Sequence, residues 1–161
     1  MTLFRAIKSI LDRLLEGLVM IVVAVLVLDV LWQVFTRFVL KDPSTWTEEL
    51  ARFMLIWVSL LGSAVALGRG AHLGIDYFVG KMSKSMQRRT EIFAFGCIAL
   101  FSLLVMFVGG IELVRSNLAL GQASPALGVK MGYVYLAIPI SGFFLTLYAV
   151  IGVAERLGGA D

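Results

Sequence analysis

Residues 14–36 read LLEGLVMIVVAVLVLDVLWQVFT, and aliphatic side chains fill most positions of this stretch. About 20 helical residues cross the ~30 Å hydrocarbon core of a bilayer, so the stretch is long enough to span it. In lipid, a lone segment satisfies its backbone N–H and C=O groups only by forming a helix. The stretch therefore predicts a transmembrane helix.

Three further apolar stretches of similar length follow, at residues 50–68, 92–114 and 131–154. Over the whole chain of 161 residues, 60% of the residues are hydrophobic and 16% are charged, against about 25% charged residues in soluble domains. The connections are short, and the stretches lack the alternating pattern of barrel strands. The sequence thus predicts an all-α integral membrane protein with four transmembrane helices in a single membrane domain, residues 1–161.

The residues before the first span have a different pattern. Large apolar residues recur at helical spacing, whereas Arg5, Lys8 and Arg13 fall mainly on the other side. Residues 3–13 are therefore predicted to form an amphipathic helix in the membrane interface, with a bend at Gly17 where the chain enters the bilayer. The alternative is that these residues simply extend the first span. A cleaved signal peptide is not expected, because its apolar core has only about 7–15 residues.

The basic residues predict an orientation. Nine of the 14 Lys and Arg residues lie in the N-terminal segment, the 69–90 connection and the C-terminal tail, and the other five lie toward the opposite side. Cytoplasmic loops of membrane proteins carry the excess of Lys and Arg. Both termini are therefore predicted to lie in the cytoplasm, with the first and third connections in the periplasm.

The first connection ends in a group of charged residues. Thr45 and Glu48 fit a capping box at a helix start, and Trp46 belongs at the level of the lipid headgroups. Glu48 and Arg52 have the i,i+4 spacing of an ion pair. This density of charge favours contact with a partner or bracing of two helix ends, with plain helix capping as the alternative. The outer charged cluster consists of Arg37, Glu48, Glu49 and Arg52.

Asp29 is the deepest charge in the first span, and it shares a polar stripe with Gln33 and Arg37. Acidic residues inside a membrane are costly and usually mark function. One hypothesis is a proton or ion site. The favoured interpretation is an acid tied to Arg37, to Arg52 or to a polar group of another helix, because no second deep acid lies nearby in the sequence.

The other three spans contain fewer residues that predict a contact or a function. Gly62 and Ala66 form a small-residue step on the second span, suited to close helix contact within the chain or with another subunit. Cys97 lies in an apolar run and is predicted to be a buried, inert thiol. Pro139 is predicted to kink the fourth span.

His72 is the only histidine, so one copy of the chain cannot form a bis-histidine haem site. His72 and Asp76 have i,i+4 spacing and are predicted to tie down the second connection. The sequence has no nucleophile–base pair, paired catalytic carboxylates, phosphate-binding glycine loop or Cys-x-x-Cys motif. We therefore expect no enzymatic activity, no metal site and no cofactor.

Several short motifs, in this order, resemble the small membrane subunit of tripartite ATP-independent periplasmic (TRAP) transporters. Each motif is weak alone, but the ordered set on four spans is specific. The motifs are WQVFTRF at 32–38, WTEELAR at 46–52, GSAVAL at 62–67, GAHLGID at 70–76, SPA at 124–126 and YVYLAIP at 133–139.

This resemblance implies a non-catalytic scaffold subunit of a sodium-coupled organic-acid importer in the bacterial inner membrane. It implies pairing with a large elevator-type membrane subunit, which carries the sodium and substrate sites, and delivery by a periplasmic substrate-binding protein. The cargo stays open among sialic acids, C4-dicarboxylates and other organic acids. The residues expected to contact a partner or to brace the structure are Asp29, Trp32, Arg37, Trp46, Glu48, Glu49, Arg52, Gly62, Ala66, His72 and Asp76.

Two other functions remain as alternatives. One is an autonomous four-helix exporter that couples to protons through Asp29. The other is a membrane anchor of a redox enzyme, which would need a bound chromophore.

Overall fold

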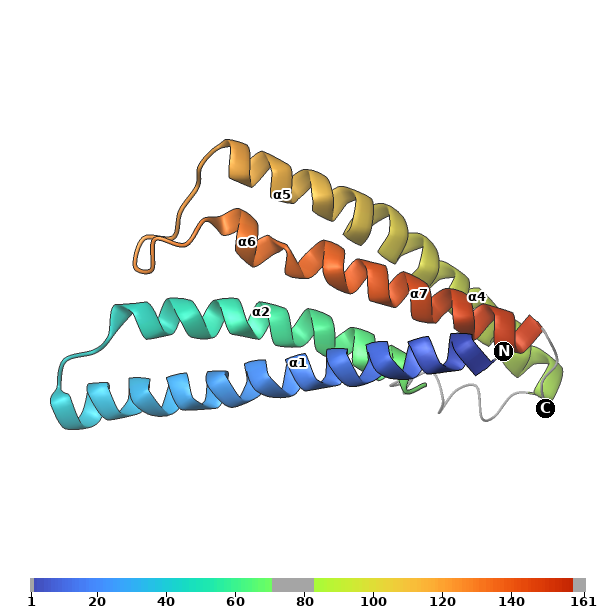
Figure 1. The fold of residues 1–161 in the computed structure, drawn as a ribbon, viewed down its shortest axis with the longest axis horizontal. Coiled ribbons are helices and arrows are strands. Elements are labelled where there is room, and N and C mark those ends of the chain that lie inside the picture. Colours follow the sequence, from blue (N-terminus) through green and yellow to red (C-terminus); the bar gives the residue numbers. More distant parts are fainter. Residues whose placement is uncertain (1, 71–82, 158–161) are drawn as a thin grey trace.

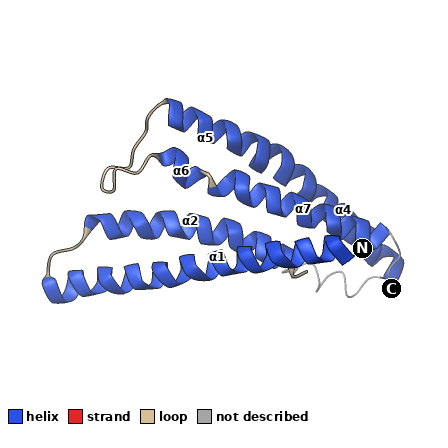
Figure 2. Cartoon of the chain, viewed as in Figure 1, coloured by secondary structure: helices blue, strands red, loops and turns tan. Residues whose placement is uncertain are grey.

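The computed structural model describes residues 2–70 and 83–157, with side chains from residue 9 onward. Within these residues, four helical stretches are long and apolar enough to cross a membrane, which confirms the predicted all-α membrane architecture (Figure 2). The stretches are Ser9–Leu40, Thr45–Gly68, Lys84–Ala119 and Met131–Leu157. Their helices are α1 (Thr2–Phe35), the π-helix η1 (Thr36–Leu40), α2 (Thr45–Gly68), α4 (Lys84–Phe101), the π-helix η2 (Ser102–Gly109), α5 (Gly110–Ala119), α6 (Met131–Tyr135) and α7 (Ala137–Leu157).

The bend predicted at Gly17 is wrong, because α1 runs unbroken from Thr2 to Phe35 (Figure 1). The residues before the first span thus form one continuous helix with it, as the alternative interpretation expects, and the interfacial position of residues 3–13 stays a prediction. The physical reason lies in the polar side chains of this segment. Asp12 and Glu16 are engaged with other helices of the chain, so this part of α1 packs on protein.

The contact between α1 and α2 follows a heptad-like seam. Residues of α1 at alternating steps of four and three are the buried or half-buried ones, whereas most of the others are exposed. This periodicity keeps one stripe of a helix against its neighbour over many turns. The exposed side of α1 is almost entirely apolar and suits contact with lipid. The seam consists of Leu15, Val19, Val22, Leu26, Asp29, Gln33 and Thr36.

The two ends of the bundle are packed differently. We call the end where α1 begins and α7 ends the terminal end, and the end with residues 41–44 and 120–130 the loop end. Figure 1 shows the helices close together at the terminal end, with the α1–α2 pair diverging from the α5–α6 pair toward the loop end. The main hydrophobic core joins α1, α2, α4 and α7, and its buried members are Leu15, Leu61, Ala64, Leu67, Phe95, Tyr148 and Ala149.

Close helix packing at two glycines holds α7 in the bundle. A Cβ atom on Gly152 would lie 2.5 Å from Cε1 of Phe95, and one on Gly142 would lie 2.8 Å from the backbone N of Phe107. Small residues allow such close approach, which drives helix association in lipid. A hydrogen bond of 2.9 Å between the hydroxyls of Ser102 and Thr146 adds a polar contact between η2 and α7.

The fourth span is interrupted near Pro139, as predicted. Helix α6 ends at Tyr135 and α7 begins at Ala137. The proline ring clashes with the carbonyl of the residue four positions earlier, which is Tyr135. The prediction for Cys97 is wrong, because this residue is exposed on the surface of the chain. An apolar run does not distinguish a side that faces protein from a side that faces lipid.

The spacing of charged residues along two of the spans matches the thickness of a bilayer. Glu16 and Arg37 are separated by about 32 Å along α1 and η1, at a rise of about 1.5 Å per residue. Glu91 and Glu112 are separated by a similar length along the third span. Both lengths match the ~30 Å hydrocarbon core, and Asp29 is the only charged residue inside either interval.

Candidate functional site

The start of α2 is organised differently from the predicted capping box. Ser44 holds the N-cap position, and no side-chain oxygen makes a cap hydrogen bond there. Thr45 is already helical, so it does not act as the N-cap. The hydroxyl of Thr47 is fully buried and donates to the carbonyl oxygen of Ser44 at 2.8 Å. The prediction of a capping box at Thr45 and Glu48 is therefore wrong, and both glutamates of this turn are used elsewhere.

Glu49 joins the start of α2 to the 121–130 loop. One carboxylate oxygen accepts hydrogen bonds from the backbone N–H of Ala126 at 3.1 Å and of Leu127 at 2.8 Å. Charge-assisted hydrogen bonds of this kind are about twice as strong as neutral ones. The loop itself is closed by Ser124, whose N–H donates to the carbonyl oxygen of Val129 at 2.9 Å. The contact thus joins the start of α2 to a loop residue that is 77 residues away in sequence.

The rest of the outer charged cluster faces outward. Arg52 donates to Glu48 at 3.2 Å, which confirms the predicted i,i+4 pair, and both side chains are more than two-thirds exposed. Such an exposed pair contributes at most about 0.5 kcal/mol to stability. Arg37 is exposed on η1, and no ion pair within the described residues joins it to this cluster. Trp46 is 43% exposed beside the cluster.

Asp29 lies on the α1–α2 seam, only 6% exposed, and neither carboxylate oxygen has a hydrogen-bond partner within the described residues. The favoured interpretation, an acid tied to Arg37, to Arg52 or to a polar group of another helix, is therefore not met among the described residues. Arg37 lies about 12 Å further along the helix and points to the exterior. Trp32 also faces outward, where its ring packs against Phe35 at a centroid distance of 5.8 Å.

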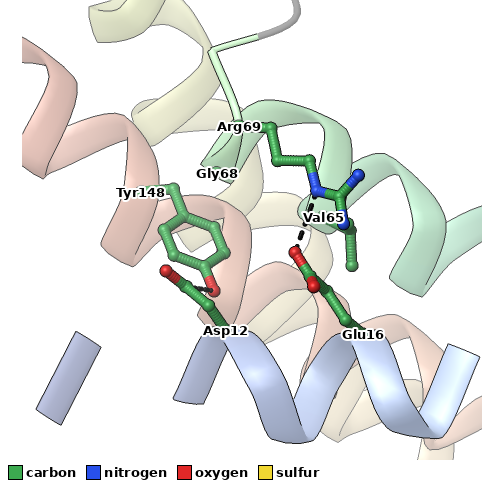
Figure 3. A pocket seen from close by; sticks show the side chains of 6 residues that line it. All are labelled: Asp12, Glu16, Val65, Gly68, Arg69 and Tyr148. Atoms are coloured by element: carbon green, nitrogen blue, oxygen red, sulfur yellow. Dashed lines mark hydrogen bonds and ion pairs between the residues drawn. The ribbon is translucent and has the colours of Figure 1, made fainter. Parts of the chain in front are cut away.

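A second group of polar contacts, at the terminal end, was not predicted. Figure 3 shows the hydroxyl of Tyr148 donating to Asp12, and the Nε of Arg69 donating to Glu16 at 2.9 Å. The Glu16 carboxylate holds the pKa of Arg69 above its ordinary value, through the hydrogen bond and the opposite charge. These contacts tie α1 to both α2 and α7. The signal in the sequence is the i,i+4 pair Asp12 and Glu16 on one face of the helix.

The same end holds α4 against α7. Arg156 donates to the carboxylate of Glu91, and its guanidinium lies 4.3 Å from the centroid of the Phe95 ring. Arg88 donates to the carbonyl oxygen of Arg156 at 2.7 Å and to that of Leu157 at 3.2 Å. These bonds satisfy carbonyl groups at the end of a helix, which have no partner inside it. The terminal end is therefore closed by polar contacts as well as by the core.

The small-residue step on α2 is half-buried, and its glycine has free space beside it. A Cβ atom on Gly62 would meet nothing within 4 Å, and Ala66 is half-buried one turn on. Small residues permit close contact between helices, but no described residue makes such a contact at Gly62. His72 and Asp76 lie outside the described residues. Among the residues that are described, no group of three His, Cys, Asp or Glu side chains could hold a metal ion.

The chain matches a known family over most of its length. Residues 26–159 match the family model for the DctQ component of tripartite ATP-independent periplasmic transporters. The sialic acid TRAP transporter small permease protein SiaQ of Vibrio cholerae is 27% identical over 141 residues, which are 88% of this chain and 80% of that protein. The C4-dicarboxylate TRAP transporter small permease protein DctQ of Rhodobacter capsulatus is 29% identical, over 68% of this chain and 47% of its own length.

A third relative is much longer. The isethionate TRAP transporter permease protein DctMQ of Oleidesulfovibrio alaskensis is 30% identical over 121 residues, which are 73% of this chain and only 19% of that protein. With its four long apolar helices, the chain is a multi-pass protein of the bacterial inner membrane. The family consists of transporter components, so neither the redox anchor nor the autonomous exporter gains support. The chain belongs to the DctQ component family of the tripartite ATP-independent periplasmic transporters, as a transport component and not an enzyme.

Proposed function

We propose that this chain is the non-catalytic scaffold subunit of a sodium-coupled importer of organic acids. The observation that carries the proposal is the family match over residues 26–159, together with relatives named small permease proteins. Those relatives are named for sialic acid and C4-dicarboxylates, which are both carboxylates. A carboxylate such as sialic acid or a C4-dicarboxylate is therefore the proposed cargo.

The distribution of polar groups supports a scaffold role. A transport pathway needs ionisable or hydrogen-bonding groups facing water or protein at membrane depth. In this chain the ion pairs within the described residues lie at the ends of the spans, and Asp29 is the one deep charge of the first span. We accordingly assign the sodium and substrate sites to the large membrane subunit, and no cofactor to this chain.

The pairing with a large subunit is supported by the longer relative. In the isethionate permease the matching segment is part of one polypeptide that is several times longer, so small and large permease parts work together there. Both termini of our chain are proposed to lie in the cytoplasm, on the basis of the Lys and Arg distribution. The loop end, with Trp46, Glu48 and Arg52 exposed, then faces the periplasm, where a substrate-binding protein docks.

Uptake by purified components in liposomes tests this proposal. The large subunit is reconstituted with and without this chain, and uptake of labelled sialic acid or succinate is measured with the periplasmic binding protein outside. We expect uptake only when the chain, the binding protein and an inward sodium gradient are all present. Uptake by the large subunit alone at the same rate, or uptake by this chain alone, would contradict the scaffold role.

A mutational control separates assembly from transport. Glu48→Gln and Arg52→Gln are combined in one variant, because these exposed residues are the proposed periplasmic contacts of this chain, whereas Glu49 already binds the 121–130 loop. The variant should lose co-purification with the large subunit or lose uptake. Unchanged assembly and uptake would exclude Glu48 and Arg52 from partner contact.

A further inference from the structure

The third and fourth spans are both interrupted at the same level of the bundle. The π-helix η2 replaces α-helical hydrogen bonding over Ser102–Gly109, and the fourth span breaks between Tyr135 and Ala137. A Cβ atom on Gly110 would lie 3.0 Å from the ring Cδ of Pro139, so the two interruptions lie side by side. Sharp bends in helices occur mainly at π-helical turns and at prolines. Both spans are therefore easiest to bend at this level.

Beyond the interruptions, α5, the 120–130 loop and α6 form one unit, which we call the arm. The two helices of the arm pack directly on each other, since a Cβ atom on Gly132 would lie 2.5 Å from Cγ of Leu118. The loop between them is closed by its own hydrogen bonds, among them the N–H of Met131 donating to the carbonyl oxygen of Gln122 at 2.9 Å. The arm thus keeps its shape through contacts within itself.

The arm lies outside the main hydrophobic core. That core joins α1, α2, α4 and α7, and none of its buried members lies in η2, α5 or α6. Among the described residues, no Cα atom of α5 lies within 8 Å of one in α1 or α2. Side chains of α2 and α6 border an open groove of about 280 Å³ where the helix pairs diverge (Figure 1). Regions without a packed core are the ones that move while the rest of a protein stays folded.

Glu49 holds the far end of the arm. Its carboxylate accepts the backbone N–H groups of Ala126 and Leu127, at 3.1 and 2.8 Å. The ten residues of α5 give the arm a length of about 15 Å. A bend of about 20°, the size at which a helix kink counts as sharp, would move the far end of such an arm by about 5 Å. No hydrogen bond persists over such a displacement, so the arm moves this far only after these two bonds break.

We propose that the arm swings as a rigid body about a hinge, and that Glu49 is the latch that holds it at the start of α2. The hinge consists of η2 and residues 136–139. The hydroxyl of Ser102 supports this assignment, because it donates to the carbonyl oxygen of Ile98 at 2.7 Å at the start of η2. Serine hydroxyls that bond back to the preceding turn often bend helices.

Distances between pairs of spin labels test the proposal on the full chain in lipid nanodiscs. The single cysteine, which is exposed, is removed as Cys97→Ser. Labels at Phe38→Cys and Leu120→Cys, both exposed positions, then measure the distance from η1 to the arm. With Glu49 in place this distance should have one narrow distribution. In the Glu49→Ala variant it should shift or broaden by about 5 Å.

Two further label pairs show which part of the chain moves. Leu113→Cys with Tyr133→Cys lies within the arm, and Met20→Cys with Phe93→Cys joins α1 to α4 outside it. Both distances should stay narrow and unchanged in the Glu49→Ala variant. Motion of a rigid arm is thus distinguished from unfolding of the loop end.

Two other substitutions test the latch and the hinge separately. Glu48→Ala is the matched control for the latch, because it removes only an exposed ion pair, and it should leave the distance from η1 to the arm unchanged. Pro139→Ala restores an N–H group that can donate to the carbonyl oxygen of Tyr135, which stiffens the hinge. Added to Glu49→Ala, it should reduce the broadening by half or more.

Three outcomes would overturn the proposal. The first is a distance from η1 to the arm that is as narrow in Glu49→Ala as in Glu48→Ala. The second is equal broadening of the label pair within the arm, which would show that the loop end unfolds. The third is undiminished broadening when Pro139→Ala is added, which would place the motion away from the hinge.

Discussion

The carboxylate of Glu49, in the first turn of α2, accepts a hydrogen bond of 2.8 Å from the backbone N–H of Leu127. Through this bond and a second one from Ala126, Glu49 links the start of the second span to the loop before the fourth. The two helix pairs diverge at this end of the bundle (Figure 1).

Loss of the Glu49 carboxylate should loosen the loop end. Glu49→Ala leaves the N–H groups of Ala126 and Leu127 without their acceptor, and we expect a loss of about 1–3 kcal/mol in the free energy of unfolding. Thermal unfolding in detergent measures it, and limited proteolysis should find new cleavage within 121–130. Glu48→Ala is the control, because it removes only an exposed ion pair and should cost at most about 0.5 kcal/mol. Equal effects of the two variants would contradict a bracing role for Glu49.

Removing the carboxylate of Asp29 should have the opposite effect on the stability of the chain. Its two oxygens are buried without a partner within the described residues, and an unsatisfied buried polar group costs about 1–3 kcal/mol. Asp29→Leu should therefore leave the stability of the chain unchanged or raise it, as measured by unfolding in detergent. A marked loss of stability would show that Asp29 has a partner outside the described residues.

The close contact between α4 and α7 depends on Gly152. A Cβ atom there would lie 2.5 Å from the Phe95 ring, which is itself covered by the Arg156 guanidinium. Gly152→Val should cost about 1–3 kcal/mol through overpacking. Gly152→Val combined with Phe95→Leu should recover part of that loss, because the shorter side chain makes room. No loss of thermal stability in the single variant would show that the helices move apart freely.

The sequence predicted the four spans well, because lipid imposes one simple rule on length and backbone pairing. It failed where the outcome depends on which side of a helix faces protein. Cys97 is exposed and Asp29 is buried, yet both lie in apolar runs that look alike. The bridge from Glu49 to the loop and the pair of Asp12 with Tyr148 join residues far apart in sequence, so no local pattern identifies them.

Gly62 provides a test of where the partner lies. A Cβ atom at this position would meet nothing within 4 Å, so we expect Gly62→Leu to leave the thermal stability of the isolated chain within about 0.5 kcal/mol. A small residue is needed on this face only if another helix approaches closely there, and Ala66 follows at the spacing of such contacts. We therefore expect Gly62→Leu to reduce co-purification with the large subunit, while Val150→Leu, on the exposed side of α7, leaves it intact. If both variants assemble equally well, the small-residue face of α2 is turned to lipid and the large subunit contacts another side of the chain.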